Sequence, residues 1–204
     1  MYSQLNEEEI ILDYFSEARK NKISLSGNIL DIGANDGITL SNTRALILKY
    51  PDIKGYFVEP NPECFSRLKN LYDKNHELYF FAIGETDGKL PMYCNKHHIS
   101  PSDIGLLSTL IQKETQRWGD EKWEIIDVDV VRYPFNDIEF DFISIDAEGM
   151  DESILFQIDL SKNKLLCIEW NSVEERKQSI DNYCKSFRLE LIHENSINLI
   201  YGRR

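Results

Sequence analysis

The sequence N-I-L-D-I-G-A-N-D-G, from Asn28 to Gly37, decides the fold. Its first five residues, 28–32, form a short apolar run that is typical of a strand buried on both faces. Glycines follow at Gly33 and Gly37, and an amphipathic helical pattern covers residues 40–50. Strand, glycine turn and helix make up the first half of a nucleotide-binding βαβ unit, where glycines let the backbone approach a ligand. The stretch therefore predicts a site for a cofactor that carries a nucleoside.

Length and charge narrow the class of protein. A chain of 204 residues can bury one full hydrophobic core, so we expect a single domain over 1–204. The formal charge of −12 argues against a nucleic acid partner, because phosphates attract a basic surface. The four cysteines form no CxxC pair, residues 1–10 are acidic rather than signal-like, and no apolar run approaches the roughly 20 residues that cross a bilayer. We therefore expect a cytoplasmic protein that does not insert into a membrane.

Strand and helix patterns alternate along the chain. Strands are expected at 28–32, 55–59, 78–83, 90–94, 123–131, 140–145, 165–170, 188–193 and 197–201. Helices are expected at 6–20, 40–50, 62–72, 150–158 and 172–187, and a short one at 106–117. This order predicts an α/β fold, a mostly parallel sheet covered by helices on both faces and closed by an antiparallel hairpin. Two parts stand apart: an N-terminal helix within 1–25 that packs on the sheet, and an insertion at 95–121 that we interpret as a substrate lid.

Three acidic residues lie where predicted strands end. Asp31, Glu59 and Asp146 each occupy the expected carboxyl end of a strand. Because ligands of parallel α/β sheets bind at this edge, we expect the three carboxylates to converge on one site.

The glycine spacing separates two classes of cofactor. A dinucleotide fingerprint has three glycines as G-x-G-x-x-G, whereas this chain has only Gly33-x-x-x-Gly37. Asp31 and Asp36 would repel a pyrophosphate, but they suit the amino and sulfonium groups of S-adenosylmethionine. Glu59 follows Gly37 at about the sequence spacing that is typical of a ribose-binding acid. Such a carboxylate accepts hydrogen bonds from both ribose hydroxyls. The pattern favours S-adenosylmethionine over a nicotinamide dinucleotide.

Four motifs occur in order along the chain. They read D-I-G-A-N-D-G, V-E-P-N-P, A-I-G-E-T-D-G and I-D-A-E-G-M-D-E. Together they resemble the successive motifs of FkbM-type methyltransferases, from about residue 28 to residue 171. The resemblance implies a Rossmann-like class I methyltransferase fold, with a seven-stranded sheet that has one antiparallel strand, and S-adenosylmethionine as cofactor.

The resemblance also implies a role for each motif. The methionine part of the cofactor would lie along Asp31, Gly33, Asn35 and Gly37. The ribose would lie at Glu59 and Pro60, and the adenine against Ala82 and Ile83. Asp146 and Glu148 match the acidic pair beside the transferred methyl group, although Ala147 and Met150 replace the valine and histidine that the family often has there.

The acidic pair suits two kinds of chemistry. An aliphatic hydroxyl is a poor nucleophile at neutral pH, unless a base or a metal ion assists it. Asp146 and Glu148 would raise each other's proton affinity and so favour a base. Alternatively Asp146, with Glu169 and Asn171 from the next strand, would hold Mg²⁺, in an arrangement similar to that of catechol-type O-methyltransferases.

Candidates for contact with the methyl acceptor are His97, His98 and Trp170. The two histidines lie in the insertion, where solvated loop residues are the simpler interpretation, and Trp170 ends a strand beside the acids. The hypothesis is an O-methyltransferase that acts on a hydroxyl of a sugar, glycan or small natural product. A nicotinamide-dependent oxidoreductase and a non-catalytic Rossmann-like interaction module stay open as alternatives.

Overall fold

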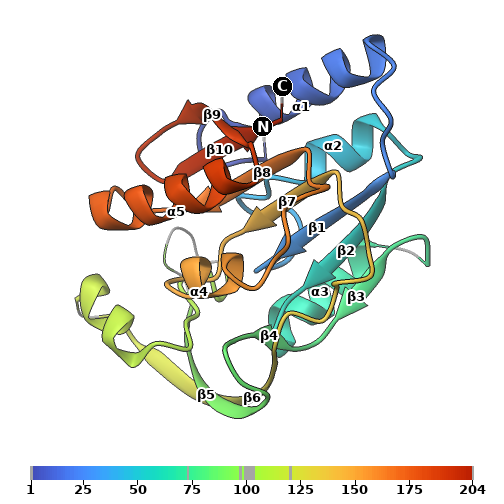
Figure 1. Cartoon of the computed structure of the whole chain (residues 1–204). Coiled ribbons are helices and arrows are strands. Elements are labelled where there is room, and N and C mark those ends of the chain that lie inside the picture. Colours follow the sequence, from blue (N-terminus) through green and yellow to red (C-terminus); the bar gives the residue numbers. More distant parts are fainter. Residues whose placement is uncertain (1, 73, 97, 99–103, 120, 204) are drawn as a thin grey trace.

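The central layer is a seven-stranded sheet with the strand order β3-β2-β1-β7-β8-β10-β9 (Figure 1). The structure is a computed structural model, and it describes residues 2–72, 74–96, 98, 104–119 and 121–203. The strands are β1 (Asn28–Ile32), β2 (Lys54–Val58), β3 (Glu77–Tyr79), β7 (Phe142–Ile145), β8 (Leu165–Glu169), β9 (Glu190–Glu194) and β10 (Asn198–Gly202). β10 runs antiparallel to β8 and β9, whereas the other four pairs are parallel. The predicted mostly parallel sheet with one antiparallel strand is confirmed.

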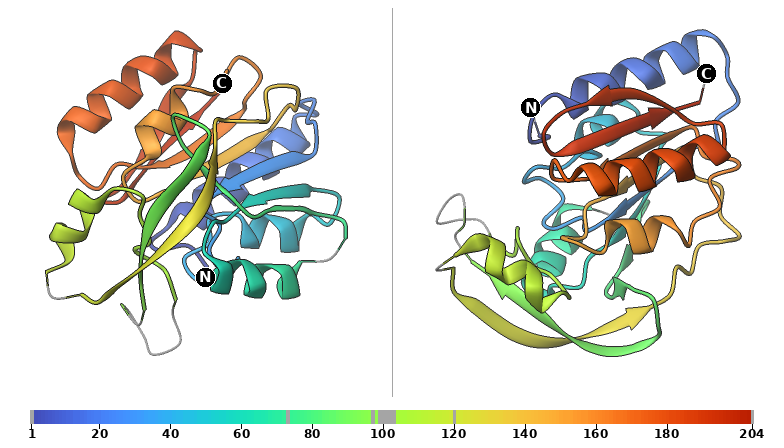
Figure 2. Two further views of the ribbon diagram at one scale, coloured as in Figure 1. Left: turned by 90° about the horizontal axis from the view of Figure 1, so that it is seen from below. Right: turned by 60° about the vertical axis from the view of Figure 1, so that its left-hand side comes forward.

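Helices cover both faces of this sheet (Figures 1 and 2). One face carries α1 (Glu7–Lys20), α2 (Arg44–Lys49) and α3 (Pro62–Leu71), and the other carries α4 (Asp151–Leu155) and α5 (Glu174–Ser186). Successive side chains of a strand point to opposite faces, so each buried strand supplies two cores. In β1, Ile29 packs with α1 to α3, whereas Leu30 and Ile32 pack with α4 and α5. Among the described helices, none is long and apolar enough to cross a membrane.

Two helix starts test capping signals of the sequence: the Asn6 and Glu9 spacing predicts a capping box at the first helix, and Asn61-Pro62 predicts a cap at the third. At α3 the Asn61 side chain accepts hydrogen bonds from the N–H groups of Glu63 and Cys64, as the Asn-Pro signal predicts. At α1 the predicted capping box is wrong, because the Asn6 side chain makes no capping bond. Its Oδ1 lies 3.0 Å from Nε2 of His193 instead. Other local contacts hold the start of this helix, because the N–H of Glu8 donates to Oγ of Ser3 at 3.1 Å and the N–H of Leu5 donates to the Glu7 carboxylate at 2.9 Å.

The insertion belongs to a second, three-stranded sheet with the order β4-β6-β5 (Figure 2). Its strands are β4 (Ala82–Ile83), β5 (Gly88–Asn95) and β6 (Trp123–Val131), and a 3-10 helix, η1 (Gln112–Trp118), follows β5. The single strand expected at 78–83 is therefore two strands in two sheets. The chain bends between them at Phe81, and the ring of Phe80 packs against that of Phe65 at 4.9 Å.

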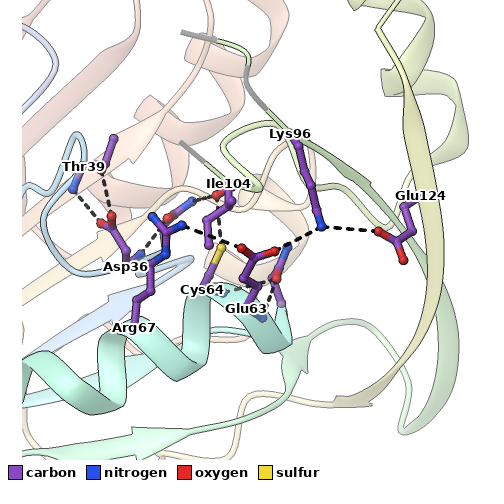
Figure 3. Close-up of polar contacts among 10 residues, drawn as sticks. Asp36, Thr39, Glu63, Cys64, Arg67, Lys96, Ile104 and Glu124 are labelled. Carbon is purple, nitrogen blue, oxygen red and sulfur yellow. Dashed lines mark hydrogen bonds and ion pairs between the residues drawn. The ribbon is translucent and has the colours of Figure 1, made fainter. Parts of the chain in front are cut away.

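Polar contacts fix this second sheet to α3 (Figure 3). Lys96, which follows β5, forms ion pairs with Glu63 of α3 at 3.1 Å and with Glu124 of β6 at 3.7 Å. The Cys64 thiol of α3 donates to the carbonyl oxygen of Ile104 at 3.1 Å. The half-exposed ion pairs contribute little energy each, but the buried thiol contact joins the insertion to the main domain. The segment that starts at Ile104 is thereby held over the carboxyl ends of β1 and β2.

Candidate active site

A cavity opens at the carboxyl edge of the main sheet, under the segment that runs from Ile104 to η1. Most of the residues predicted for the site line it: Asp31, Gly33, Asn35, Glu59, Pro60, Ala82, Ile83, His98, Asp146, Glu148, Glu169 and Asn171. They come from segments up to 140 positions apart, and the parallel sheet brings them together because it aligns its strand ends at one edge.

Gly33 lets the turn after β1 lie directly against the backbone of Asp146. Its φ is +83°, and a Cβ at this position would lie 1.8 Å from the carbonyl oxygen of Asp146. In return, the N–H of Asp146 donates to the carbonyl of Ile32 at 3.0 Å. Only glycine fits this contact, so the turn and the end of β7 form one floor of the cavity.

Gly37 and Asp36 have a different place from the one predicted. Gly37 is not among the residues that line the cavity, and a Cβ on it would lie 2.7 Å from Cδ1 of Leu68 on α3. The Asp36 carboxylate accepts from the N–H groups of Ile38 and Thr39 and from the Thr39 hydroxyl, at 2.7–2.9 Å. The expected contact of Gly37 with the cofactor is thus corrected: these two residues shape and pack the turn.

Glu59 is a buried acceptor with both oxygens already oriented. It accepts hydrogen bonds from the N–H groups of Asn35 at 2.8 Å and Asn61 at 2.7 Å. Burial raises the pKa of Glu59 to about 7, although these two bonds oppose the shift. Each carboxylate oxygen has more than one acceptor position, so Glu59 can still accept from two hydroxyls in the cavity.

Asp31 lies next to it on the floor of the cavity. Its carboxylate accepts from the hydroxyl of Thr43 at 2.6 Å, and burial raises its pKa to about 6. The side chain of Asn35 lines the cavity and also contacts the insertion, because its amide donates to the Ile104 carbonyl at 3.1 Å. This bond ties the glycine turn to the roof of the cavity.

Three carboxylates meet at the ends of β7 and β8. Asp146, Glu148 and Glu169 each place one oxygen within 4.8 Å of the oxygens of the other two. Burial, and then the charges of Asp151 and Asp31, raise the pKa of Asp146 to about 7. Burial and the neighbouring carboxylates also raise the pKa of Glu148 and Glu169 well above the ordinary value. A cation or a hydrogen-bond donor that enters this cluster would therefore favour its ionisation.

The loop that carries Glu148 is held from two sides. Glu148 itself has a φ of +44°, and the hydroxyl of Thr109 in the roof donates to its carbonyl at 2.7 Å. Asp151 accepts from the N–H groups of Ala147 at 2.8 Å and Gly149 at 3.0 Å. Asp151, the first residue of α4, therefore holds the Glu148 loop from this helix, whereas Thr109 holds it from the roof.

Aromatic residues of the insertion form one wall of the cavity. His98 and Trp118 both line it, with their ring centroids 5.0 Å apart, and Nδ1 of His98 lies 3.0 Å from a carboxylate oxygen of Glu121. The structure contradicts the prediction for Trp170. Its indole N–H donates to the carbonyl of Asn195 at 2.8 Å and its ring packs in the core with α4 and α5. His97 lies outside the described residues.

Several residues outside the sequence motifs also line the cavity. Gln4, Asn42 and Ser144 line the cavity beside Asp31, and Trp118 takes the place that was expected for Trp170. None of the described residues that line the cavity is a lysine or an arginine. With five carboxylates and no basic side chain among these residues, the cavity attracts cations and repels phosphates.

Comparisons with known proteins place the chain in a family. Solved structures with similar chain traces include precorrin-6y C5,15-methyltransferase from Geobacter metallireducens, with 10% identity over 94% of this chain and 87% of that one and a TM-score of 0.48. A putative caffeoyl-CoA O-methyltransferase from Staphylococcus aureus has 14% identity over 96% and 83%, with a TM-score of 0.47. The N-terminal domain of EvdMO1 with SAH bound has 11% identity over 100% and 83%, with a TM-score of 0.45. A comparison with curated proteins gives no match.

The sequence model of one family matches the chain over residues 31–195, which include the glycine turn, the whole second sheet and the acidic cluster. Since this model, the methyltransferase FkbM domain, covers most of the 204 residues, the chain belongs to the FkbM methyltransferase family.

Proposed function

We propose that the protein transfers a methyl group from S-adenosylmethionine to a hydroxyl oxygen of a sugar, a glycan or another small natural product. The observation that carries the proposal is the acidic cavity. It runs from Glu59 past Gly33 to Asp146, and its described lining includes no lysine or arginine. This charge suits a sulfonium cofactor and a neutral acceptor, and it disfavours the pyrophosphate of a nicotinamide dinucleotide.

The residues of the cavity fit the parts of S-adenosylmethionine. Glu59 would accept hydrogen bonds from the ribose hydroxyls, and the buried pair Ala82 and Ile83 would pack against the adenine. The missing side chain at Gly33 lets the cofactor pass close to the backbone. Asp31 lies where the amino group would need a negative partner.

The chemistry at the other end is proton removal from the acceptor. Bound S-adenosylmethionine supplies an electrophilic methyl group and leaves as S-adenosylhomocysteine when the new oxygen–carbon bond has formed. Asp146, with a pKa of about 7, is the group that we assign to take the proton of the hydroxyl. Burial and the charges of Asp151 and Asp31 keep the proton affinity of Asp146 high, because both oppose its ionisation.

The same cluster fits a divalent cation such as Mg²⁺. Carboxylate oxygens are the ligands that this ion prefers, and Oε2 of Glu169 is buried and has no hydrogen-bond partner in the described part of the chain. Glu148 forms the group of close carboxylates with Asp146 and Glu169, and Asn171 also lines the cavity. A bound cation would lower the pKa of an acceptor hydroxyl.

Calorimetric titration with Mg²⁺ and Mn²⁺ is expected to show one site whose affinity falls as the pH is lowered from 8 to 6. The sign follows from competition, because protons displace the cation from carboxylates whose pKa values lie near 7 or above. Glu169→Gln should weaken binding by at least about 10-fold, since it removes one charged ligand. The exposed Glu175→Gln serves as the matched control. Equal affinities for the wild type and Glu169→Gln would contradict this site.

Transfer of an isotope-labelled methyl group tests the proposed reaction. The protein is incubated with labelled S-adenosylmethionine and a panel of sugars, glycans and hydroxylated natural products, and the products are examined by mass spectrometry and NMR. A methoxy group is expected. If the labelled methyl group is bound only to nitrogen or carbon in the products, the proposed transfer to oxygen is wrong.

A further inference from the structure

The segment ahead of α1 reaches the cavity. Ser3 forms a parallel β-bridge with Leu40, in the loop that precedes α2, and Ser3 is itself buried. The next residue, Gln4, lines the cavity together with Leu40 and Asn42. The N-terminal segment, residues 2–6, is therefore part of the cavity wall as well as a support for the sheet.

Buried Glu7 holds this segment in place. One of its carboxylate oxygens accepts from the side-chain amides of Asn195 and Asn198, both at 2.8 Å, and the other accepts from the N–H of Leu5 at 2.9 Å. Burial raises the pKa of Glu7, but the bonds from Asn198 and Asn195 outweigh it, so the pKa lies below its ordinary value. Glu7 is thus charged at neutral pH and fixes the wall to the loop between β9 and β10.

A polar recess lies between this wall and the sheet. Along β1 and β7, Asp31 and Ser144 alternate with residues of the core under α4 and α5, so both point toward α1 and α2. Asn42 is 7% exposed, and its Nδ2 lies 3.4 Å from Oγ of Ser144. Its Oδ1 is buried and has no hydrogen-bond partner among the described residues, although it belongs to a residue that lines the cavity. A buried acceptor of this kind can take a hydrogen bond from a donor of a bound ligand.

The charges of the cavity determine which part of the cofactor suits the recess. With the ribose at Glu59, and with Asp146, Glu148 and Glu169 turned to the acceptor, the amino-acid end of S-adenosylmethionine needs one negative and one neutral neighbour. Asp31 and Oδ1 of Asn42 can accept from its ammonium group. Its carboxylate has to avoid all five acids of the cavity and needs a donor, and Gln4, which follows the bridge of Ser3 to Leu40, brings a neutral amide donor to the cavity lining.

We infer that Gln4 binds the methionine carboxylate of S-adenosylmethionine, and that Glu7 is the positioning residue that holds the Gln4 segment in reach. This assignment rests on the proposed cofactor and adds a residue outside the 31–195 match to the family model.

Calorimetry with two ligands tests the assignment. S-adenosylhomocysteine contains the amino-acid end, whereas 5′-methylthioadenosine is a nucleoside thioether that lacks it. Gln4→Ala should weaken binding of S-adenosylhomocysteine by about 10-fold or more, because a hydrogen bond to a charged group is lost. Gln4→Glu should weaken it further through repulsion. Both variants should bind 5′-methylthioadenosine with the wild-type affinity and keep the wild-type melting temperature, because the Gln4 side chain is exposed. The exposed Gln178→Ala is the matched control.

Two results would overturn the assignment. One is an unchanged affinity of Gln4→Ala and Gln4→Glu for S-adenosylhomocysteine. The other is an equal loss of affinity for both ligands, which would indicate a general disturbance of the cavity. If the wild type binds neither ligand, the proposed cofactor itself is wrong and the assignment falls with it. The wild-type titration thus distinguishes the two failures.

Discussion

Gly33→Ala is expected to abolish cofactor binding and to destabilise the protein by about 2–6 kcal/mol. A positive φ costs an alanine about 1–3 kcal/mol, and forcing a methyl group into a filled space costs about as much again. Here the methyl carbon would lie 1.8 Å from a backbone oxygen of Asp146, so the turn and the end of β7 have to separate. Since domains of this size are stable by only about 5–15 kcal/mol, the loss is large.

Chemical denaturation and calorimetry with S-adenosylhomocysteine measure the two effects. Gly27→Ala is the matched control, because Gly27 has a φ of +82° but a Cβ on it would meet only the carbonyl oxygen of Asp52, at 3.8 Å. This variant carries the backbone strain without the clash and should bind as the wild type does. Equal losses of stability and of cofactor affinity in the two variants would show that the close contact of Gly33 with Asp146 contributes to neither.

Asp146→Asn is expected to lower the rate of methyl transfer by about 10²–10⁴-fold, the usual contribution of a general base. Asparagine keeps the shape of the side chain but cannot take the proton of the acceptor. Binding of S-adenosylhomocysteine should change little, because the ribose and adenine contacts lie elsewhere. Since the pKa of Asp146 is about 7, the wild-type rate should rise with pH and level off above neutrality, where the carboxylate is ionised.

Labelled methyl transfer to an acceptor found for the wild type provides the rate, and the exposed Asp137→Asn serves as control. A rate of Asp146→Asn close to that of the wild type would remove Asp146 from the reaction. A loss of both rate and cofactor affinity would instead assign Asp146 to cofactor binding.

The part of the site that the sequence predicted is the part that a parallel sheet dictates. Asp31, Glu59 and Asp146 each follow a buried strand, and the shared direction of β1, β2 and β7 brings them to one cavity. The role of Gly33 was predictable because only glycine allows such close contact between two backbone segments. The seven-stranded sheet and its antiparallel strand were predictable for the same reason, since alternating strand and helix patterns leave few topologies.

What could not be predicted depends on contacts between distant segments. Trp170 ends a predicted strand beside the acids and is the better candidate from the sequence, and only the position of the insertion shows that Trp118 lines the cavity instead. Gln4 enters the wall through the bridge between Ser3 and Leu40, which no local spacing signals. Gly37 resembled a ligand-binding glycine but is needed for packing on α3.

The most direct test of the central claim is a calorimetric titration of the wild type and Glu59→Gln with S-adenosylhomocysteine and with NAD. We predict that the wild type binds S-adenosylhomocysteine and not NAD. Glu59→Gln should weaken this binding by about 10-fold or more, because the charged acceptor of two ribose hydroxyls is lost. Exposed Glu175→Gln should bind as the wild type does. Binding of NAD in place of S-adenosylhomocysteine, or equal affinity of the wild type and Glu59→Gln, would contradict the proposed cofactor site.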